Sequence, residues 1–261
     1  MNSQPRDAQG VYKAQMTGPL LGYFTFAYDL FTVQDNGRLD ARLIERLKNS
    51  DQFQGARHEL FAEATCLRAG FSIEHEDETD RSTRHAEFTA THKTTGQAVS
   101  VEAKSKHRPG ILGFPGTRQA EGEHNLNVAR LLNDAIQKNT PHPLVVFFDL
   151  NLPWLTASRL LEERIPPHPV IQGTLDRMRR RHLGKDPINL LVVTNHPEHY
   201  SADEEAAPSP QILSILTQLP VKPVARPAAL MAVHQAANLY GRIPQFFDGR
   251  PPAEMSLGTS R

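Results

Sequence analysis

The amino-acid sequence predicts an α/β fold in which helices flank a mixed central sheet. Three observations favour it. Residues 87–104 alternate polar and apolar side chains around a turn, residues 144–148 and 189–194 are short apolar runs, and helical apolar spacing fills segments between them. Alternation indicates strands, short apolar runs bounded by turn residues indicate buried strands, and helical spacing indicates amphipathic helices. Elements of both kinds along one chain build a layered α/β domain.

Helices are expected ahead of the first strand. Residues 19–33 predict a short helix, and residues 38–49 place leucine and isoleucine on one helical stripe among charged residues. Ser50 or Asp51 would cap the next helix, because a short polar side chain can accept from the first free N–H groups. That helix would end at Gly70, since glycine readily adopts the left-handed conformation found at helix ends, and a strand would follow.

The stretch from residue 87 to residue 104 predicts two antiparallel strands joined by a turn at residues 94–96. Side chains alternate along a strand, so one face carries Glu87, Glu102 and Lys104. The other face carries the apolar residues Phe88, Ala90, Val99, Val101 and Ala103. A slip of one residue would turn all of these away from the core, so the apolar pattern selects the pairing.

The polar face of this hairpin has a chemical use. Two carboxylates about one strand apart suit Mg²⁺ or Mn²⁺, which prefer oxygen ligands and keep open positions for water and phosphate oxygens. A lysine beside the ion can orient or deprotonate an attacking water and offset charge that builds up on phosphorus. A Glu-X-Lys on a strand, taken alone, is usually a solvated face with an ordinary ion pair.

The elements around the hairpin carry a family resemblance. A helix with Glu59 ends at a glycine and leads into a strand, an acidic residue, a turn and Val-Glu-Ala-Lys-Ser. This order resembles the PD-(D/E)XK nuclease superfamily, which includes Holliday junction resolvases and many restriction enzymes, over residues 55–150. Ala86-Glu87 stands where the family usually has Pro-Asp. The resemblance implies a restriction endonuclease-like core and metal-dependent hydrolysis of nucleic acid, with DNA favoured.

The resemblance also implies roles for individual residues. The ligands of Mg²⁺ or Mn²⁺ would be Glu59, which holds the ion directly or through water, Glu87, Glu102 and the carbonyl of Ala103. Lys104 would position the attacking water, and Gln137 resembles a glutamine that some members place beside the site. Glu59 is preferred over Glu63, one turn away, because its distance from Gly70 fits the family pattern.

Basic residues near this motif could hold phosphates. Lys106, His107, Arg108 and Arg118 follow the Glu-X-Lys in a glycine-rich loop and would contact the nucleic-acid backbone. Residues 174–182 predict an arginine-rich helix that could track a nucleic acid, remain solvated or contact a partner protein. Formal net charge is zero, so a nucleic acid must be held by such local patches.

The rest of the chain predicts further helices and a tail. Helices are expected over residues 125–139, 154–163, 211–219 and 227–239, with an acidic loop at 74–80 and a loose tail at the end. We expect a helical extension at 1–50, the nuclease-like core at 51–200 and a C-terminal helical segment with the tail at 201–261.

Composition bounds the protein class and compartment. A single cysteine excludes a disulfide scaffold and fits a reducing cytoplasm. No apolar run is long enough to cross a membrane, and the first residues lack the pattern of a signal peptide, so a cytoplasmic protein without membrane contact is expected. Two alternatives stay open: a catalytically inactive nuclease-fold protein that serves binding or assembly, and a subunit that recruits its nucleic acid through a partner protein. A homodimer is a further option.

Overall fold

The computed structural model describes residues 16–36, 39–75, 86–119, 128–138, 140–161, 169–201 and 206–240. Its strands are β1 (Phe71–His75), β2 (Phe88–His92), β3 (Ala98–Ser105), β4 (Leu144–Asp149), β5 (Leu190–Asn195) and β6 (Gln211–Leu216). Its helices are α1 (Gly18–Asn36), α2 (Ala41–Leu47), α3 (Phe53–Arg68), α4 (Ala129–Ile136), α5 (Trp154–Leu161), α6 (Pro169–Arg181), the 3-10 helix η1 (Pro197–Tyr200) and α7 (Pro227–Asn238). Most of the expected acidic loop and the whole expected tail lie outside the described residues. None of the described helices is both long and apolar enough to span a membrane.

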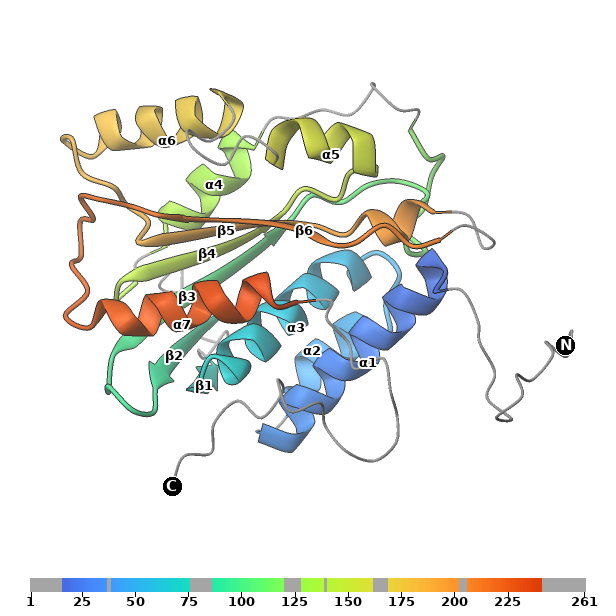
Figure 1. Ribbon diagram of the computed structural model, residues 1–261, viewed down its shortest axis with the longest axis horizontal. Coiled ribbons are helices and arrows are strands. Elements are labelled where there is room, and N and C mark those ends of the chain that lie inside the picture. The colour runs from blue at the N-terminus through green and yellow to red at the C-terminus, as the bar shows by residue number, and fades with distance from the viewer. Residues whose placement is uncertain are drawn as a thin grey trace, which may run out of the picture.

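The strands form one mixed six-stranded sheet in the order β1-β2-β3-β4-β5-β6 (Figure 1). Strands β1, β2 and β3 pair antiparallel in their order along the chain. Strands β3, β4 and β5 are parallel, and helices lie in the connections between them, which parallel pairing requires. Strand β6 returns antiparallel to β5. The predicted α/β fold with a mixed sheet is confirmed.

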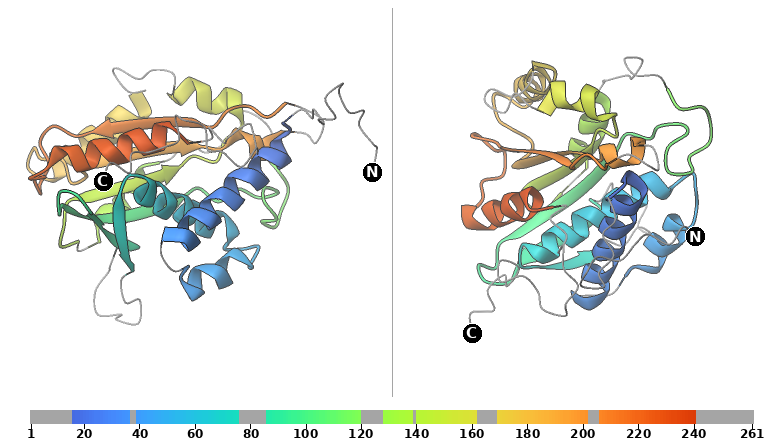
Figure 2. Two further views of the ribbon diagram at one scale, coloured as in Figure 1. Left: turned by 60° about the horizontal axis from the view of Figure 1, so that its bottom comes forward. Right: turned by 45° about the vertical axis from the view of Figure 1, so that its right-hand side comes forward.

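Helices cover both faces of the sheet. Helices α3 and α7 pack on one face, α1 and α2 lie outside α3, and α4, α5 and α6 cover the opposite face (Figures 1 and 2). Each face has its own apolar core. Phe61, Phe71 and Phe147 are fully buried on the α3 side, whereas Leu132 and Phe148 are buried on the α4 side.

The hairpin forms with the pairing that its apolar pattern predicts. Phe88 lies opposite Val101 and Ala90 lies opposite Val99, and all four side chains are buried in the core on the α3 side. The intervening turn contains Gly96 with a φ of 68°, a left-handed conformation that favours glycine. The opposite face of β3 is therefore left for its polar residues.

The prediction of a helix over residues 211–219 is wrong, because residues 211–216 form strand β6. Its backbone pairs with β5 along the whole strand, from Asn195 opposite Gln211 to Leu190 opposite Leu216. Apolar residues point to both faces, with Ile212 against the α3 side core and Leu213 in the opposite core. Periodicity over so short an apolar run does not separate a strand from a helix.

Several helix boundaries also differ from the prediction, among them those of α1, α2, α3 and α6. Gln52, rather than Ser50 or Asp51, precedes α3, and its side chain makes no capping hydrogen bond. Asp40 instead caps α2, with its carboxylate accepting from the N–H groups of Arg42 and Leu43. Helix α1 is longer than expected, with 19 residues, because it packs along α3. The predicted end of α3 at Gly70, with a φ of 85°, is confirmed.

Candidate functional site

The polar face of β3 lies beneath α4. Because Val99 and Val101 face α3, the alternation of the strand turns Glu102 and Lys104 to the other side of the sheet. Strand β4 pairs with β3 along this stretch, with Val146 opposite Glu102. The sheet therefore holds the two polar side chains on a rigid, doubly paired strand.

Four charged side chains meet at this point. The Lys104 ammonium contacts Oε1 of Glu102 and lies 3.5 Å from Oε1 of Glu87. Lys138, just beyond α4, places its Nζ 3.4 Å from the same oxygen of Glu102. The Glu102 side chain is fully buried, whereas those of Glu87, Lys104 and Lys138 are 18%, 21% and 23% exposed. Solvent therefore reaches the cluster from the side of these three.

The electrostatics of the cluster follow from burial and from close charges. Burial and the neighbouring Glu87 raise the pKa of Glu102, although Lys104 and Lys138 oppose that rise. Burial acts to lower the pKa of Lys104, but Glu102 and Glu87 outweigh it, and the net pKa lies above the ordinary lysine value. Lys104 is therefore an ammonium at neutral pH, suited to orienting water and stabilising negative charge rather than to taking up a proton.

Oxygen Oε2 of Glu102 is buried and has no hydrogen-bond partner among the described residues. A buried carboxylate oxygen without a partner is costly, and such atoms commonly mark a site for an ion or ligand. Glu87 and Glu102 provide the oxygen chemistry of a Mg²⁺ or Mn²⁺ site, with Ala103 between Glu102 and Lys104 on β3. No group of three or more His, Cys, Asp or Glu in the described ranges could hold a metal. A Mg²⁺ or Mn²⁺ ion held by so few protein ligands would keep several waters.

Glu59 lies on α3 and reaches this cluster only through its charge. Its Oε2 lies 2.6 Å from a guanidinium nitrogen of Arg46 on α2. Burial and the charge of Glu87 nevertheless raise the pKa of Glu59 to about 7, because they outweigh Arg46. The neighbouring Glu63 is fully buried and lies 2.9 Å from His75. Glu59 is therefore the α3 acid whose charge couples to Glu87.

Substitution of Glu59 by glutamine should change how stability depends on pH. A carboxyl whose pKa rises on folding from 4.5 to about 7 binds more protons folded than unfolded between these pH values. The wild type should therefore lose stability relative to Glu59→Gln as pH rises from 4.5 to about 7, and the difference should level off above. Urea unfolding of both proteins from pH 4.5 to 8.5 measures it. A constant difference would contradict the raised pKa, and Glu45→Gln, at an exposed position on α2, is the control.

Sequence reasoning missed Lys138. Gln137 was the expected site residue, but it forms the exposed C-cap of α4, and Lys138 next to it contacts Glu102. Helical spacing places residue 137 correctly at the end of a helix but does not say which of two consecutive side chains turns toward the sheet. In the sequence, the one feature that could have pointed to Lys138 as a site residue is its position next to Gln137.

The two arginines expected to bind phosphates have contacts within the fold. Arg108 is buried, and its guanidinium donates to the backbone carbonyls of Leu150 and Asn151 at 3.4 and 3.1 Å. Arg118 is exposed, but it donates to the carbonyl of Tyr200 at 2.6 Å and lies 4.8 Å above that ring. Arg108 thus fastens the loop after β3 to the segment that follows β4, and Arg118 fastens it to η1.

Lys106 and His107 are more accessible. Lys106 is half-buried just beyond the end of β3, and burial together with Arg108 lowers its pKa. His107 is exposed and packs its ring edge-on to Phe114 at 5.5 Å. Of the four basic residues, these two make no side-chain hydrogen bond or ion pair with other residues in the described part of the chain, so they are the better candidates for phosphate contacts.

The arrangement can bind a hydrated cation, position a phosphate and stabilise developing negative charge. Glu87 and Glu102 supply negative oxygens, and Lys104 and Lys138 supply positive charge on the same partly exposed patch. That combination is typical of phosphoryl transfer sites. Comparisons of the chain with protein-family models, curated proteins and solved structures gave no match.

Proposed function

We propose that this chain is a metal-dependent nuclease that hydrolyses phosphodiester bonds in nucleic acid, with DNA as the favoured substrate. The observation that carries the proposal is the buried carboxylate of Glu102, whose Oε1 contacts Lys104 and Lys138 and whose Oε2 has no partner among the described residues. Burying charged side chains on the face of a sheet costs free energy that a solvated surface pair does not cost. Such buried charged clusters are typical of functional sites.

The order of elements adds support. Helix α3 with Glu59 leads to β1, then to the β2–β3 hairpin, to α4 and to β4, which runs parallel to β3. This is the order that the resemblance to PD-(D/E)XK nucleases implies: a helix with an acidic residue, strands with the acidic residue and Glu-X-Lys, then a helix and a strand. The restriction endonuclease-like assignment of the sheet is part of the proposal.

In this proposal Glu87, Glu102 and the carbonyl of Ala103 would hold Mg²⁺ or Mn²⁺, and Glu59, which is paired with Arg46, would act on the ion through water. The bound ion supplies Lewis-acid chemistry and lowers the pKa of a coordinated water. Lys104 orients the attacking water and stabilises negative charge on the phosphate in the transition state. Lys138 adds positive charge on the α4 side, and Lys106 and His107 hold the phosphate backbone near the site.

The experiment measures cleavage and metal binding by one preparation. Plasmid, linear and single-stranded DNA and RNA are incubated with Mg²⁺, Mn²⁺ or EDTA, and the melting temperature is followed against metal concentration. We expect cleavage only with metal, and a melting temperature that rises with the logarithm of metal concentration, because the folded state alone binds the ion. Glu102→Gln should lose both effects, whereas Glu45→Gln should keep them.

A second candidate is a nuclease-fold protein without catalytic activity that serves binding or assembly. It is favoured by the absence, among the described residues, of three potential metal ligands in one group and by the lysines that contact Glu102. This candidate predicts no cleavage and no metal-dependent rise in melting temperature. The same experiment therefore decides between the two, because the melting temperature reports metal binding even where no substrate is cut.

A further inference from the structure

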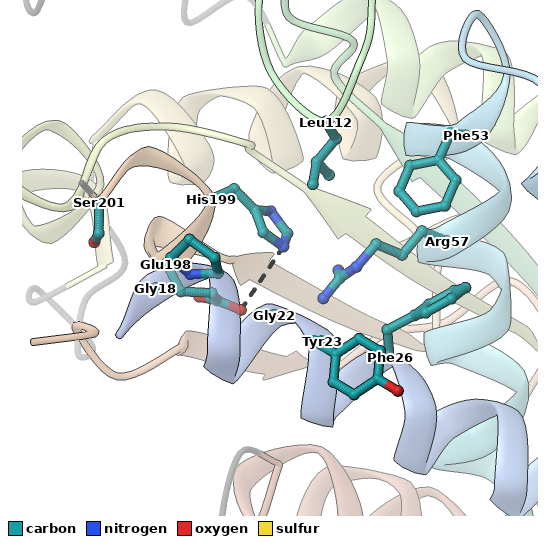
Figure 3. A pocket seen from close by; sticks show the side chains of 11 residues that line it. Gly18, Gly22, Tyr23, Phe26, Phe53, Arg57, Leu112, Glu198, His199 and Ser201 are labelled. Atoms are coloured by element: carbon teal, nitrogen blue, oxygen red, sulfur yellow. Dashed lines mark ion pairs between the residues drawn. The ribbon is translucent and has the colours of Figure 1, made fainter. Parts of the chain in front are cut away.

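A pocket of about 320 Å³ lies between the start of α1, the start of α3, the loop after β3 and η1 (Figure 3). Its lining residues are Gly18, Pro19, Gly22, Tyr23, Phe26, Phe53, Arg57, Leu112, Glu198, His199 and Ser201. This volume is within the range of small-molecule sites, which are mostly apolar with a few placed polar groups. None of the lining residues belongs to the Glu102 cluster.

Three buried polar groups in this pocket lack adequate partners. Arg57 is only 5% exposed, and its one hydrogen bond within the described residues is long, 3.4 Å to the hydroxyl of Thr25. Oε2 of Glu198 and Nε2 of His199 are buried without hydrogen bonds to any described residue. Figure 3 shows Arg57 and His199 pointing toward the same space. Buried polar groups without partners cost free energy, so several at one pocket indicate that a ligand completes them.

The charges in the pocket select the kind of ligand. Arg57 offers N–H donors, whereas Glu198 offers a carboxylate that would repel a simple anion. His199 is neutral at pH 7, because burial and the charge of Arg57 hold its pKa well below the ordinary value. The ligand should therefore present acceptor atoms to Arg57 and N–H donors to Glu198 rather than a second full charge.

Aromatic walls add a requirement for shape. The rings of Phe26 and Phe53 lie 5.7 Å apart, and Tyr23, 66% exposed, stands at the rim. Flat heteroaromatic bases pack well on such side chains, and stacking of this kind tolerates the rest of the molecule lying in solvent. Gly22 leaves room on the α1 side, where a Cβ would only reach ordinary contact with the His199 ring at 3.6 Å.

We propose that this pocket binds a guanine base, with Arg57 donating to O6 and N7 and Glu198 accepting from N1–H and the 2-amino group. Arginine commonly recognises guanine through these two acceptors. Adenine has an amino group in place of O6 and no N1–H, so it would face Arg57 with a donor and Glu198 with an acceptor. The base can come from a free nucleotide or from a strand, and the proposal does not depend on nuclease activity.

Calorimetric titration of the full chain with GMP, AMP, 7-deaza-GMP and inorganic phosphate tests the proposal without metal or cleavage. We expect GMP to bind at least about tenfold more tightly than AMP, and 7-deaza-GMP to bind more weakly than GMP because it lacks the N7 acceptor. Inorganic phosphate should not bind. Equal binding of GMP, AMP and phosphate would assign the pocket to phosphate and overturn the proposal, as would no binding of GMP at millimolar concentration.

Variants locate the site. Arg57→Met and Glu198→Gln should each weaken GMP binding by about tenfold or more, since each removes a base-specific contact. Arg42→Met and Glu45→Gln, at exposed positions on α2, are matched controls that should bind GMP like the wild type. Unchanged binding in Arg57→Met and Glu198→Gln would overturn the proposal.

A further position, Gly22, guards against a loss of binding that comes from misfolding. Gly22→Leu should fill the pocket and abolish GMP binding while it preserves α1, because leucine is a better helix former than glycine. A folded Gly22→Leu that binds GMP like the wild type would place the nucleotide elsewhere. Titration with two short single strands, identical except for one guanine or adenine, distinguishes a strand from a free nucleotide as the source.

Discussion

Lys104→Ala should lower nucleic-acid cleavage by about 100- to 1000-fold, the range seen when one preorganised charge-stabilising group is removed from an active site. Lys104 is the one side chain, within the described contacts, that touches both Glu87 and Glu102. Its ammonium is held protonated by these carboxylates, so it offers positive charge at neutral pH where the phosphate would lie. Single-turnover cleavage with excess enzyme measures the chemical step apart from substrate release.

The matched control is Lys93→Ala. Lys93 is exposed in the turn of the same hairpin, so its loss removes one positive charge without touching the cluster. Far-ultraviolet circular dichroism and the melting temperature would show that Lys104→Ala is folded, and Lys104→Met, which keeps the apolar stem, guards against a packing defect. Wild-type cleavage rates in both Lys104 variants would remove this residue from the mechanism.

The hairpin and the buried strands could be predicted because local pattern and tertiary burial agree there. Phe88 and Val101 alternate with polar neighbours, and one face of each strand is packed on α3. Only one pairing both keeps the alternation in register and buries the apolar face against α3. Strand β6 shows where this fails. Ile212 and Leu213 point into different cores, so its apolar pattern has no period of two, and only its neighbour β5 decides that it is a strand.

The candidate site likewise has residues that the sequence pattern predicts and one that it does not. Glu102 and Lys104 are two apart on one strand, and Glu87 faces them across a short hairpin, so their meeting follows from strand geometry. Lys138 reaches them from just beyond α4, an element outside the hairpin, and the rotation of that helix depends on its packing in the α4 side core. The sequence pattern therefore predicted Gln137, the residue next to Lys138.

The pocket around Arg57 lies beyond pattern reasoning. Its polar residues come from α3 and η1, and its walls come from α1 and the loop after β3, which lie far apart in the chain. Arg57 looks like an ordinary charged helix residue in the sequence, and its burial results from α1 packing across α3. Only the assembled fold shows that Arg57 and Glu198 line the same cavity.

The sheet that carries the site should depend strongly on Phe147. This side chain is fully buried on β4, pairs opposite Ala103 on β3 and Val192 on β5, and packs edge-on against Phe61 of α3 at 5.9 Å. Phe147→Ala should reduce the free energy of unfolding by about 3–5 kcal/mol, because it removes a large apolar side chain and leaves a cavity where rigid strands cannot close in. Equilibrium urea unfolding followed by circular dichroism measures the change.

Phe31→Ala is the matched control for this prediction, since the Phe31 side chain is 63% exposed on α1. Its unfolding free energy should stay within about 0.5 kcal/mol of the wild type, as surface substitutions usually do. Similar losses in the two variants would mean that the tight core around β4 does not dominate stability. A large loss confined to Phe147→Ala would show that the core on the α3 side holds β4 in place beside Glu102 and Lys104.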